Sequence, residues 1–444
     1  MTKVAGFDYF EVEFTKDGSI DDRNKVKELT DSLSSDGVTD LVVLAHGWNN
    51  DMDEARGLYE RLLGSVNARM SGAELGERNL AVLAVLWPSK RFAEEELIAG
   101  GGASLTGAPD ESELVDRLEG LKGTFDDDNA DENLEKAKTL IPKLGEDKEA
   151  QKEFVDLVRA SLREDDADDE DASDEFFALP GDEVMARLAI PDIETGAAGP
   201  VAGTGGVASM TDAGGAPAPQ GGAAGIGDWI ENARNAARNL LNFATYYQMK
   251  SRAGTVGNHG VYEVLREART ARPDLKLHLV GHSFGGRLVA AAATGPSGKP
   301  PVVVDSLMLL QAAFSHLGFA QDYEGSKDGL FRSMITGKAV KGPALITHTD
   351  NDRAVGLAYP LASRIARSVA SGLGDKNDRY GGIGRNGAQK TPEAKEAVLL
   401  KSGSTYELEP GGMYNLRSDD LISNHSDVTG PEVAQALLAA IAVT

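Results

Sequence analysis

The clearest candidate for chemistry in this sequence is Ser283, which lies in the motif GHSFGG at residues 281–286. The apolar segment 275–280 (LKLHLV) predicts a strand, and the alanine-rich segment 287–293 (RLVAAAA) predicts a helix. A sharp turn between them would hold the serine in a strained backbone conformation, with its hydroxyl exposed at the N-terminus of the helix. Glycines two residues to either side would let strand and helix approach closely. The pattern predicts a nucleophilic serine.

With 51 glycines among 444 residues, a G-x-S-x-G pattern arises easily by chance, so the strand before it and the helix after it carry the argument. In this context the motif GHSFGG resembles the α/β-hydrolase superfamily, in particular its lipase-like and esterase-like members. The resemblance covers the predicted core. It implies an eight-stranded, mostly parallel sheet and a catalytic triad that follows the chain order Ser, acid, His.

The resemblance implies a triad acid just beyond a later strand, and the strand predicted at 344–348 (ALITH) is followed by Asp350 and Asp352. Asp352 fits better, because it lies four residues past His348 and directly before an apolar pair. Asp350 stays open as the alternative. Either aspartate could instead cap the helix predicted from about residue 355.

The resemblance also requires a histidine after the last strand, and His425 is the only one of seven histidines that follows the acid. Thr429 and Glu432 predict a capping box, with Pro431 at the start of the final helix. A histidine with an ordinary pKa of about 6.5 can take and return the proton of a serine hydroxyl. His282, next to the serine, is expected to pack or to support the loop.

An acyl-transfer site also needs backbone N–H groups that stabilise the developing oxyanion. The resemblance suggests Phe284, directly after the serine, and Trp48 in the loop HGWNND at 46–51, which follows a strand predicted at 41–45. The alternative is that His46 and Trp48 only pack this loop. The asparagines and aspartates that follow are interpreted as a helix cap, because they lack the order of an EF-hand cation site.

These residues predict a serine hydrolase that cleaves a carboxylic ester through an acyl-enzyme, with Ser283, Asp352 and His425 as the triad. The substrate is expected to be a small-molecule or lipid-like ester, and neither cofactor nor metal is expected. The same triad also serves peptidases, thioesterases and amidases. A non-catalytic scaffold that recruits a protein partner through an acidic segment is the alternative from another class.

The charge of the chain limits the classes of partner that we expect it to bind. The net charge is −25, and residues 101–200 hold 29 Asp and Glu against 10 Lys and Arg. Such a surface repels nucleic acid and anionic membranes, since both are bound through Lys and Arg. There is no cysteine, and we find neither a signal peptide nor an apolar run long enough to span a membrane. A cytoplasmic protein is expected.

The chain divides by pattern into a core interrupted by an insertion. Residues 1–92 and 229–444 alternate strands with amphipathic segments, which predicts one doubly wound α/β domain. Residues 93–228 are expected to be an insertion that is partly helical and partly disordered. Within it, the acidic run 163–175 predicts a solvated loop, and the Gly/Ala-rich stretch 195–227 predicts a linker.

After the insertion, Asp228 is expected to cap a helix that runs to about Lys250. The glycine-containing segment 252–260 (RAGTVGNHG) is interpreted as a turn, because it lacks the GKS or GKT of a phosphate loop.

Overall fold

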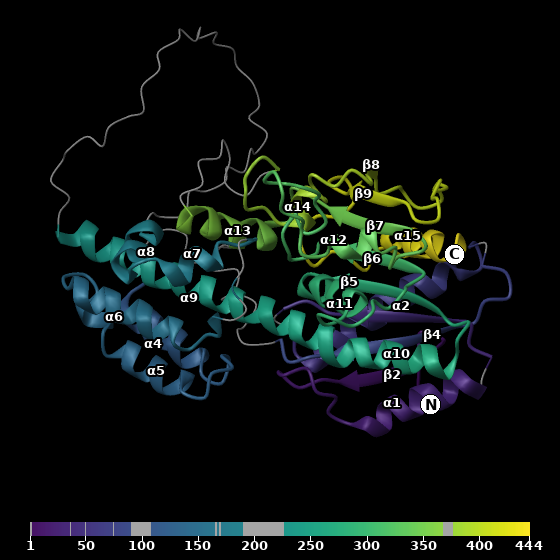
Figure 1. Cartoon of the computed structure of the whole chain (residues 1–444), viewed down its shortest axis with the longest axis horizontal. Helices are drawn as coiled ribbons and strands as arrows, with labels where there is room; N and C mark the ends of the chain where they lie inside the picture. The colour runs from purple at the N-terminus through teal and green to yellow at the C-terminus, as the bar shows by residue number, and fades with distance from the viewer. Residues whose placement is uncertain are drawn as a thin grey trace, which may run out of the picture.

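The computed structural model describes residues 2–35, 37–48, 50–73, 75–89, 108–164, 167, 170–189, 226–366 and 376–444. These residues form one nine-stranded sheet flanked by helices (Figure 1). The strands are β1 (Thr2–Val4), β2 (Phe7–Glu13), β3 (Asp40–Ala45), β4 (Leu80–Leu86), β5 (Lys276–His282), β6 (Ser306–Leu310), β7 (Ala344–His348), β8 (Ala394–Val398) and β9 (Met413–Arg417).

The strand order across the sheet is β1-β2-β4-β3-β5-β6-β7-β9-β8. Every neighbouring pair is parallel except β1 and β2. The predicted α/β class and mostly parallel sheet are confirmed. Eight strands were implied and nine are observed among the described residues. Strands β1 and β8 lie at the two edges of this sheet, and β8 is a short strand with partly exposed side chains.

Helices cover both faces of the sheet, as the apolar runs of the central strands predict. In β3, Leu41 and Val43 pack in the core on one face, while Val42 and Leu44 pack in the core on the other. The helices of the core are α1 (Arg23–Ser35), α2 (Met52–Met70), α9 (Ile226–Val256), α10 (Tyr262–Ala271), α11 (Phe284–Thr294), α12 (Arg332–Thr336), α13 (Arg353–Ile365), α14 (Ile383–Asn386) and α15 (Pro431–Ala442).

The described part of the predicted insertion is helical. It contains α4 (Glu111–Gly120), α5 (Ala130–Lys138), α6 (Lys148–Arg159), α7 (Ser173–Ala178) and α8 (Gly181–Leu188). Figure 1 shows these helices grouped beside the first half of α9, to one side of the sheet. Their apolar side chains, among them Phe154, Phe176 and Leu188, are buried in the same hydrophobic core as the apolar side chains of α9.

The acidic run 163–175 is not simply a solvated loop. Asp171 is buried and its Oδ2 lies 2.8 Å from Nζ of Lys250 in α9, and the run ends in α7. An ion pair that bridges segments far apart in the sequence gives no local signal. Residues 165, 166, 168 and 169 lie outside the described residues, as does the predicted linker up to residue 225.

The helix predicted from Asp228 begins earlier and ends later. It starts at Ile226, so Asp228 lies in its first turn, and it reaches Val256. The segment interpreted as a turn is therefore helical, and a π-helical turn (Gly257–Val261) joins α9 to α10. A Cβ on Gly257 would lie 2.2 Å from the carbonyl oxygen of Leu288, so this glycine allows close packing within a helix.

The boundaries of the other strands and helices differ less from what the sequence pattern suggests. Strand β6 begins at Ser306, although residues 302–304 before it are also apolar. The N-cap of α15 is Gly430 and no side chain caps it, so the predicted box of Thr429 and Glu432 does not form, although Pro431 is the first helical residue. In the part of the chain that the structure describes, no helix combines the length and apolar character needed to cross a membrane.

Candidate active site

Ser283 lies between β5 and α11 with φ 56° and ψ −126°. A non-glycine residue with positive φ is strained, and the surrounding hydrogen bonds hold it there. Its N–H donates to the carbonyl of Leu310 at 3.0 Å, and its own carbonyl accepts from Gly286 and Ala313. The end of β6 therefore fixes the turn from the neighbouring strand.

The two glycines that flank the serine are required by close approach. A Cβ on Gly281 would lie 2.3 Å from the carbonyl oxygen of Gly285. A Cβ on Gly285 would lie 2.2 Å from the carbonyl oxygen of Ala45, at the end of β3. Helix α11 can begin directly over the two strands because neither position carries a side chain.

The structure brings His425 and Asp352 together. Nδ1 of His425 lies 2.9 Å from Oδ2 of Asp352, whose side chain is fully buried. The other oxygen, Oδ1, accepts a 2.9 Å hydrogen bond from the N–H of Val355, so Asp352 is also the N-cap of α13. Asp350 is exposed, and its backbone N–H donates to Asp419. Of the two aspartates, Asp352 is therefore the one in contact with His425.

His282 joins the segment that carries Ser283 to the loop that carries His425. Its Nε2 lies 2.9 Å from the backbone carbonyl oxygen of His425, and the centroids of the two imidazole rings are 4.8 Å apart. Burial, together with the neighbouring His425, lowers the pKa of His282 to about 3. His282 is therefore a neutral imidazole near pH 7.

The loop after β3 approaches the serine from the other side. A Cβ on Gly47 would lie 2.6 Å from Cβ and 3.2 Å from Oγ of Ser283. The carbonyl oxygen of Gly47 is held by Nδ1 of His46 at 2.9 Å and by Nδ2 of Asn50 at 3.2 Å. The ring of the adjacent Trp48 packs against Phe284 at a centroid distance of 6.0 Å.

The tautomer of His46 follows from its contacts. The backbone N–H of Trp87 donates to Nε2 of His46, so Nδ1 carries the proton and donates to Gly47. Burial lowers the pKa of His46 to about 4, which keeps the ring neutral. The sequence predicted no more than packing for His46, and its role in holding the Gly47 peptide was missed. The expected helix cap is confirmed, since Asp51 and Glu54 form a capping box on α2.

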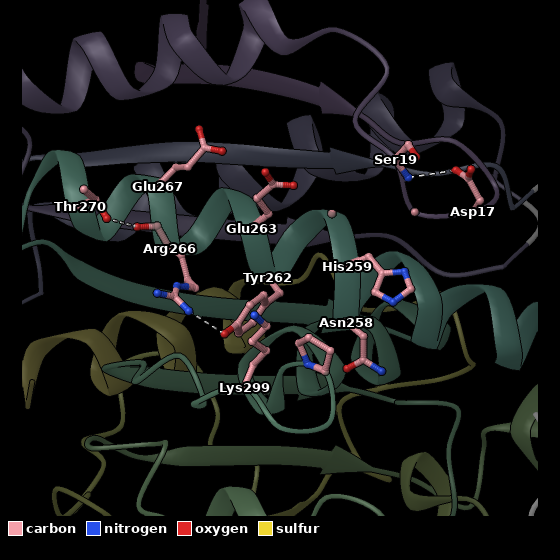
Figure 2. Close-up of a pocket in the computed structure, with 13 residues that line it drawn as sticks. Asp17, Ser19, Asn258, His259, Tyr262, Glu263, Arg266, Glu267, Thr270 and Lys299 are labelled. Atoms are coloured by element: carbon pink, nitrogen blue, oxygen red, sulfur yellow. Dashed lines mark hydrogen bonds between the residues drawn. The ribbon is translucent and has the colours of Figure 1, made fainter.

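Ser283 is only 5% exposed, and aromatic rings surround the start of α11. The ring of Phe284 lies between those of Trp48 and Tyr246, and the Tyr246 hydroxyl is hydrogen-bonded to that of Tyr359. The described residues also line a surface hollow of about 630 Å³ near the π-helical turn (Figure 2), with His259 and Arg266 among its lining side chains. None of the candidate site residues lines this hollow.

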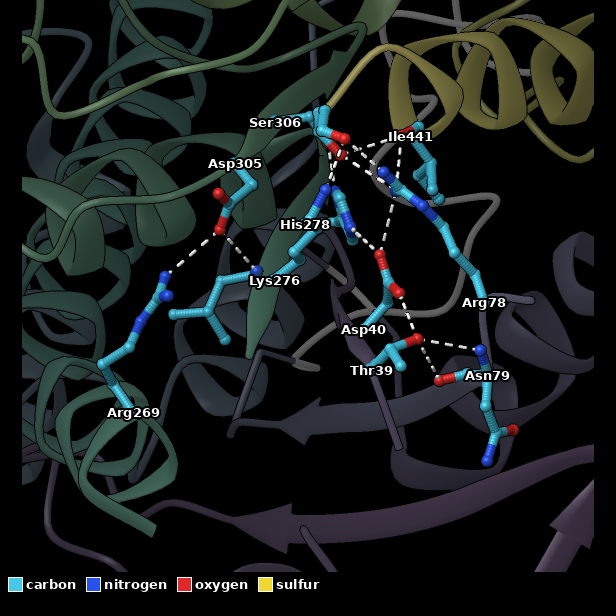
Figure 3. A network of polar contacts seen from close by, with 12 residues as sticks. Thr39, Asp40, Arg78, Asn79, Arg269, Lys276, His278, Asp305, Ser306 and Ile441 are labelled. Carbon is cyan, nitrogen blue, oxygen red and sulfur yellow. Dashed lines mark hydrogen bonds and ion pairs between the residues drawn. The ribbon is translucent and has the colours of Figure 1, made fainter. Parts of the chain in front are cut away.

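A second chain of Ser, His and Asp lies where strands β3, β5 and β6 begin (Figure 3). Nδ1 of His278 lies 2.8 Å from Oγ of Ser306, and Nε2 lies 2.9 Å from Oδ1 of Asp40. All three residues are buried, and they belong to regular strands. Arg78 also binds Asp40, at 3.1 Å. This network ties three strands together, and its serine has no strained turn to expose its hydroxyl.

The charge state of this network follows from its partners. Burial alone would raise the pKa of the Asp40 carboxyl, but hydrogen bonds from His278 and Thr39 and the charge of Arg78 hold that pKa below its ordinary value. Asp40 is therefore an ionised, fully paired carboxylate. Serine, histidine and aspartate thus occur together both here and around Ser283. The two places differ in the backbone at the serine, since Ser283 lies on a strained turn and Ser306 lies in a regular strand.

Comparison with protein-family models, with curated proteins and with solved structures finds no match to this chain. The assignment of function therefore depends on the geometry of the site.

Proposed function

We propose that this chain is a serine hydrolase that cleaves a carboxylic ester through an acyl-enzyme intermediate. The observation that carries the proposal is the 2.9 Å contact between Nδ1 of His425 and Oδ2 of Asp352, in a chain where Ser283 stands on a strained strand-to-helix turn. Ser283 is the nucleophile, His425 the base and Asp352 the residue that orients the base. Together they form a triad in the order Ser, acid, His.

The proposed reaction follows from these roles. Oγ of Ser283 attacks the carbonyl carbon of the ester, and its proton passes to Nε2 of His425. Asp352 accepts a hydrogen bond from Nδ1–H, which fixes the tautomer and stabilises the imidazolium. The bond to the alcohol oxygen then breaks, and His425 gives its proton to the departing alcohol. Water attacks the acyl group by the same route, and the proton returns to Ser283.

Two backbone N–H groups are proposed to bind the oxyanion. Phe284 is the first residue of α11, so its N–H has no acceptor within the helix. In a trans peptide the carbonyl and the following N–H point in opposite directions. Because His46 and Asn50 hold the carbonyl of Gly47, the N–H of Trp48 is directed away from them. Loss of one such donor costs roughly 100- to 1,000-fold in kcat.

The surroundings of Ser283 favour an apolar acyl group. The ring of Phe284, the residue after Ser283, packs against the rings of Trp48 and Tyr246, so the start of α11 lies among aromatic side chains. An acyl chain would gain free energy by burying against such rings, at about 25 cal/mol per Å². We therefore propose a small-molecule or lipid-like ester as the substrate.

The test is hydrolysis of p-nitrophenyl esters of increasing acyl length by the wild-type chain, Ser283→Ala and Ser306→Ala. Ser306→Ala is the matched control, because this serine also contacts a histidine that binds an aspartate. We expect Ser283→Ala to lose several orders of magnitude in kcat/KM while Ser306→Ala keeps its activity. A fluorophosphonate should label the wild type at Ser283. Absence of both hydrolysis and labelling in the wild type would refute the proposal.

A further inference from the structure

Ser283 and His425 come from distant parts of the chain, and a hydrogen bond from His282 connects them. His282 is the last residue of β5 and directly precedes Ser283. Its Nε2 reaches the carbonyl oxygen of His425 at 2.9 Å, across 143 positions of sequence. One residue therefore ties the backbone that carries the serine to the backbone that carries the base.

The direction of this hydrogen bond is fixed by its acceptor. A carbonyl oxygen can only accept, so Nε2 of His282 carries the proton and donates. Nδ1 is then the unprotonated nitrogen. It is buried, and it has no hydrogen-bond partner among the residues that the structure describes. Only the donor nitrogen of His282 is engaged in a hydrogen bond, and that bond goes to His425.

His425 is consequently held at two points. Its ring is held through Nδ1 by Asp352, which caps α13, and its backbone is held through the carbonyl by His282 on β5. The ring contact alone would leave the imidazole free to move with its loop relative to Ser283. A misplacement of about 1 Å can cost about 100-fold in rate, so the backbone anchor bears directly on catalysis.

We propose that His282 is a positioning residue, which sets the backbone of His425 against Ser283 through its Nε2–H···O bond. The proposal rests on the proposed hydrolase function. His282 also stays neutral beside the base, because burial and the nearby His425 lower its pKa to about 3. The imidazolium that forms on His425 during acylation therefore meets no second cation at a ring distance of 4.8 Å.

Two substitutions distinguish the effect of the hydrogen bond that His282 donates from the effect of the space that its side chain fills. His282→Gln keeps an N–H donor of similar reach, whereas His282→Leu keeps an apolar side chain of similar size and leaves the carbonyl of His425 without its donor. Both variants are made in the full chain. The readouts are kcat and KM for a p-nitrophenyl ester, the pH profile of kcat/KM, the rate of fluorophosphonate labelling and Tm.

We expect His282→Leu to lower kcat by roughly 10- to 100-fold with KM little changed, and to slow labelling in parallel. We expect His282→Gln to recover most of this loss. The acidic limb of the pH profile should move to lower pH in His282→Leu, because a loosened contact with Asp352 stabilises the imidazolium less. In His282→Gln this limb should match the wild type.

The proposal is overturned if His282→Leu keeps the wild-type kcat, or if both variants lose activity in proportion to their loss of Tm. The first result would make the bond to His425 dispensable, and the second would reduce His282 to packing. Failure of the hydrolase function is recognised separately, by a wild type that is neither active nor labelled. In that case the NMR signal of the His425 ring tests the anchor. It should shift in His282→Leu and stay near its wild-type position in His282→Gln.

Discussion

The two carboxylate oxygens of Asp352 contact different partners. Oδ2 lies 2.9 Å from Nδ1 of His425, and Oδ1 accepts a hydrogen bond from the N–H of Val355 at the start of α13. The two interpretations that the sequence allowed for this residue, helix cap and triad acid, are thus compatible. One oxygen serves each contact, and complete burial of the side chain fixes both. The helix that the carboxylate caps thus also fixes the orientation of Oδ2 toward His425.

We predict that Asp352→Asn lowers kcat by about 10,000-fold while the protein remains folded. Asparagine is as good an N-cap as aspartate, so α13 keeps its cap, but an amide does not hold the Nδ1–H tautomer of His425. Steady-state kinetics and circular dichroism measure the two effects. Asp350→Asn is the control, since Asp350 is exposed and should leave activity close to wild type. Equal losses in both variants would contradict the assignment.

We predict that Gly47→Ala removes activity and labelling. The new Cβ would lie 2.6 Å from Cβ of Ser283, so either the serine or the loop must move, and we expect a loss of at least about 100-fold. Gly64→Ala, in the middle of α2, is the control, because a Cβ there meets nothing within 4 Å. That control should gain up to about 1 kcal/mol of stability. A fully active Gly47→Ala would place this loop away from the reacting atoms.

We predict that stability falls as the pH is lowered from about 6.5 toward 4, in part because of the two buried neutral histidines. In the folded state the pKa of His46 is about 4 and that of His282 about 3, against 6.5 when unfolded. The unfolded chain therefore binds more protons in this window, so stability is full above pH 6.5 and is lost on acidification. Between pH 7 and pH 5 each histidine accounts for about 2 kcal/mol.

Urea denaturation at pH 7 and pH 5 measures this dependence. In His282→Gln the difference in unfolding free energy between the two pH values should be smaller by about 2 kcal/mol. Comparison of variant with wild type cancels the contribution of the carboxylates that protonate in the same range. An unchanged difference would mean that His282 is not held neutral in the folded state.

The buried strands and the turn at Ser283 could be predicted, because each has a strong local signal in the sequence. The strands predicted at 41–45 and 344–348 match β3 and β7 within one residue, because strands buried on both faces leave little room for polar side chains. The turn at Ser283 followed from the strand and helix patterns around GHSFGG, and the structure has Ser283 directly before α11 with a positive φ. The preference for Asp352 as the triad acid followed from the resemblance to α/β-hydrolases and stays a prediction, although Asp352 is the aspartate that contacts His425.

The parts that were missed depend on contacts between distant segments. The glycines of 252–260 indicated a turn, yet a Cβ on Gly260 would lie 2.3 Å from the carbonyl of Gly18, so that position needs a glycine within a helix. Strand β8 has no apolar run, because it lies at the edge of the sheet. The contact of His282 with His425 has no sequence signature, since it joins residues 143 positions apart.

We predict that Asp40→Ala destabilises the protein without affecting chemistry. Removal of this carboxylate takes the ion-pair partner from Arg78, which keeps its contacts with Ile441 and Thr444, and takes the acceptor from Nε2 of His278 (Figure 3). The loss of one member of a buried ion pair costs about 3–5 kcal/mol. Urea denaturation gives the free energy, and labelling of Ser283 below the transition reports the site. Loss of labelling in protein that is still folded would contradict a purely structural role for this network.

We predict that Lys250→Ala loosens the helices α4–α8 from the core. Lys250 and Asp171 form an ion pair at 2.8 Å with both side chains almost fully buried, so removal of the lysine leaves a buried carboxylate without its cation and costs about 3–5 kcal/mol. Limited proteolysis should then cut within 111–188 faster than in the wild type. Lys136→Ala is the control, because its pair with Glu132 is exposed and should contribute little.

The double variant Lys250→Met, Asp171→Leu decides whether the charges themselves are needed. Replacement of a buried ion pair by apolar side chains of similar size is often neutral, since no uncompensated charge remains. We therefore expect the double variant to regain most of the protease resistance that Lys250→Ala loses. If both variants are cut equally fast, the helices α4–α8 depend on the ion pair for their docking. If neither is cut faster than the wild type, the apolar contacts of α4–α8 suffice to hold them against α9.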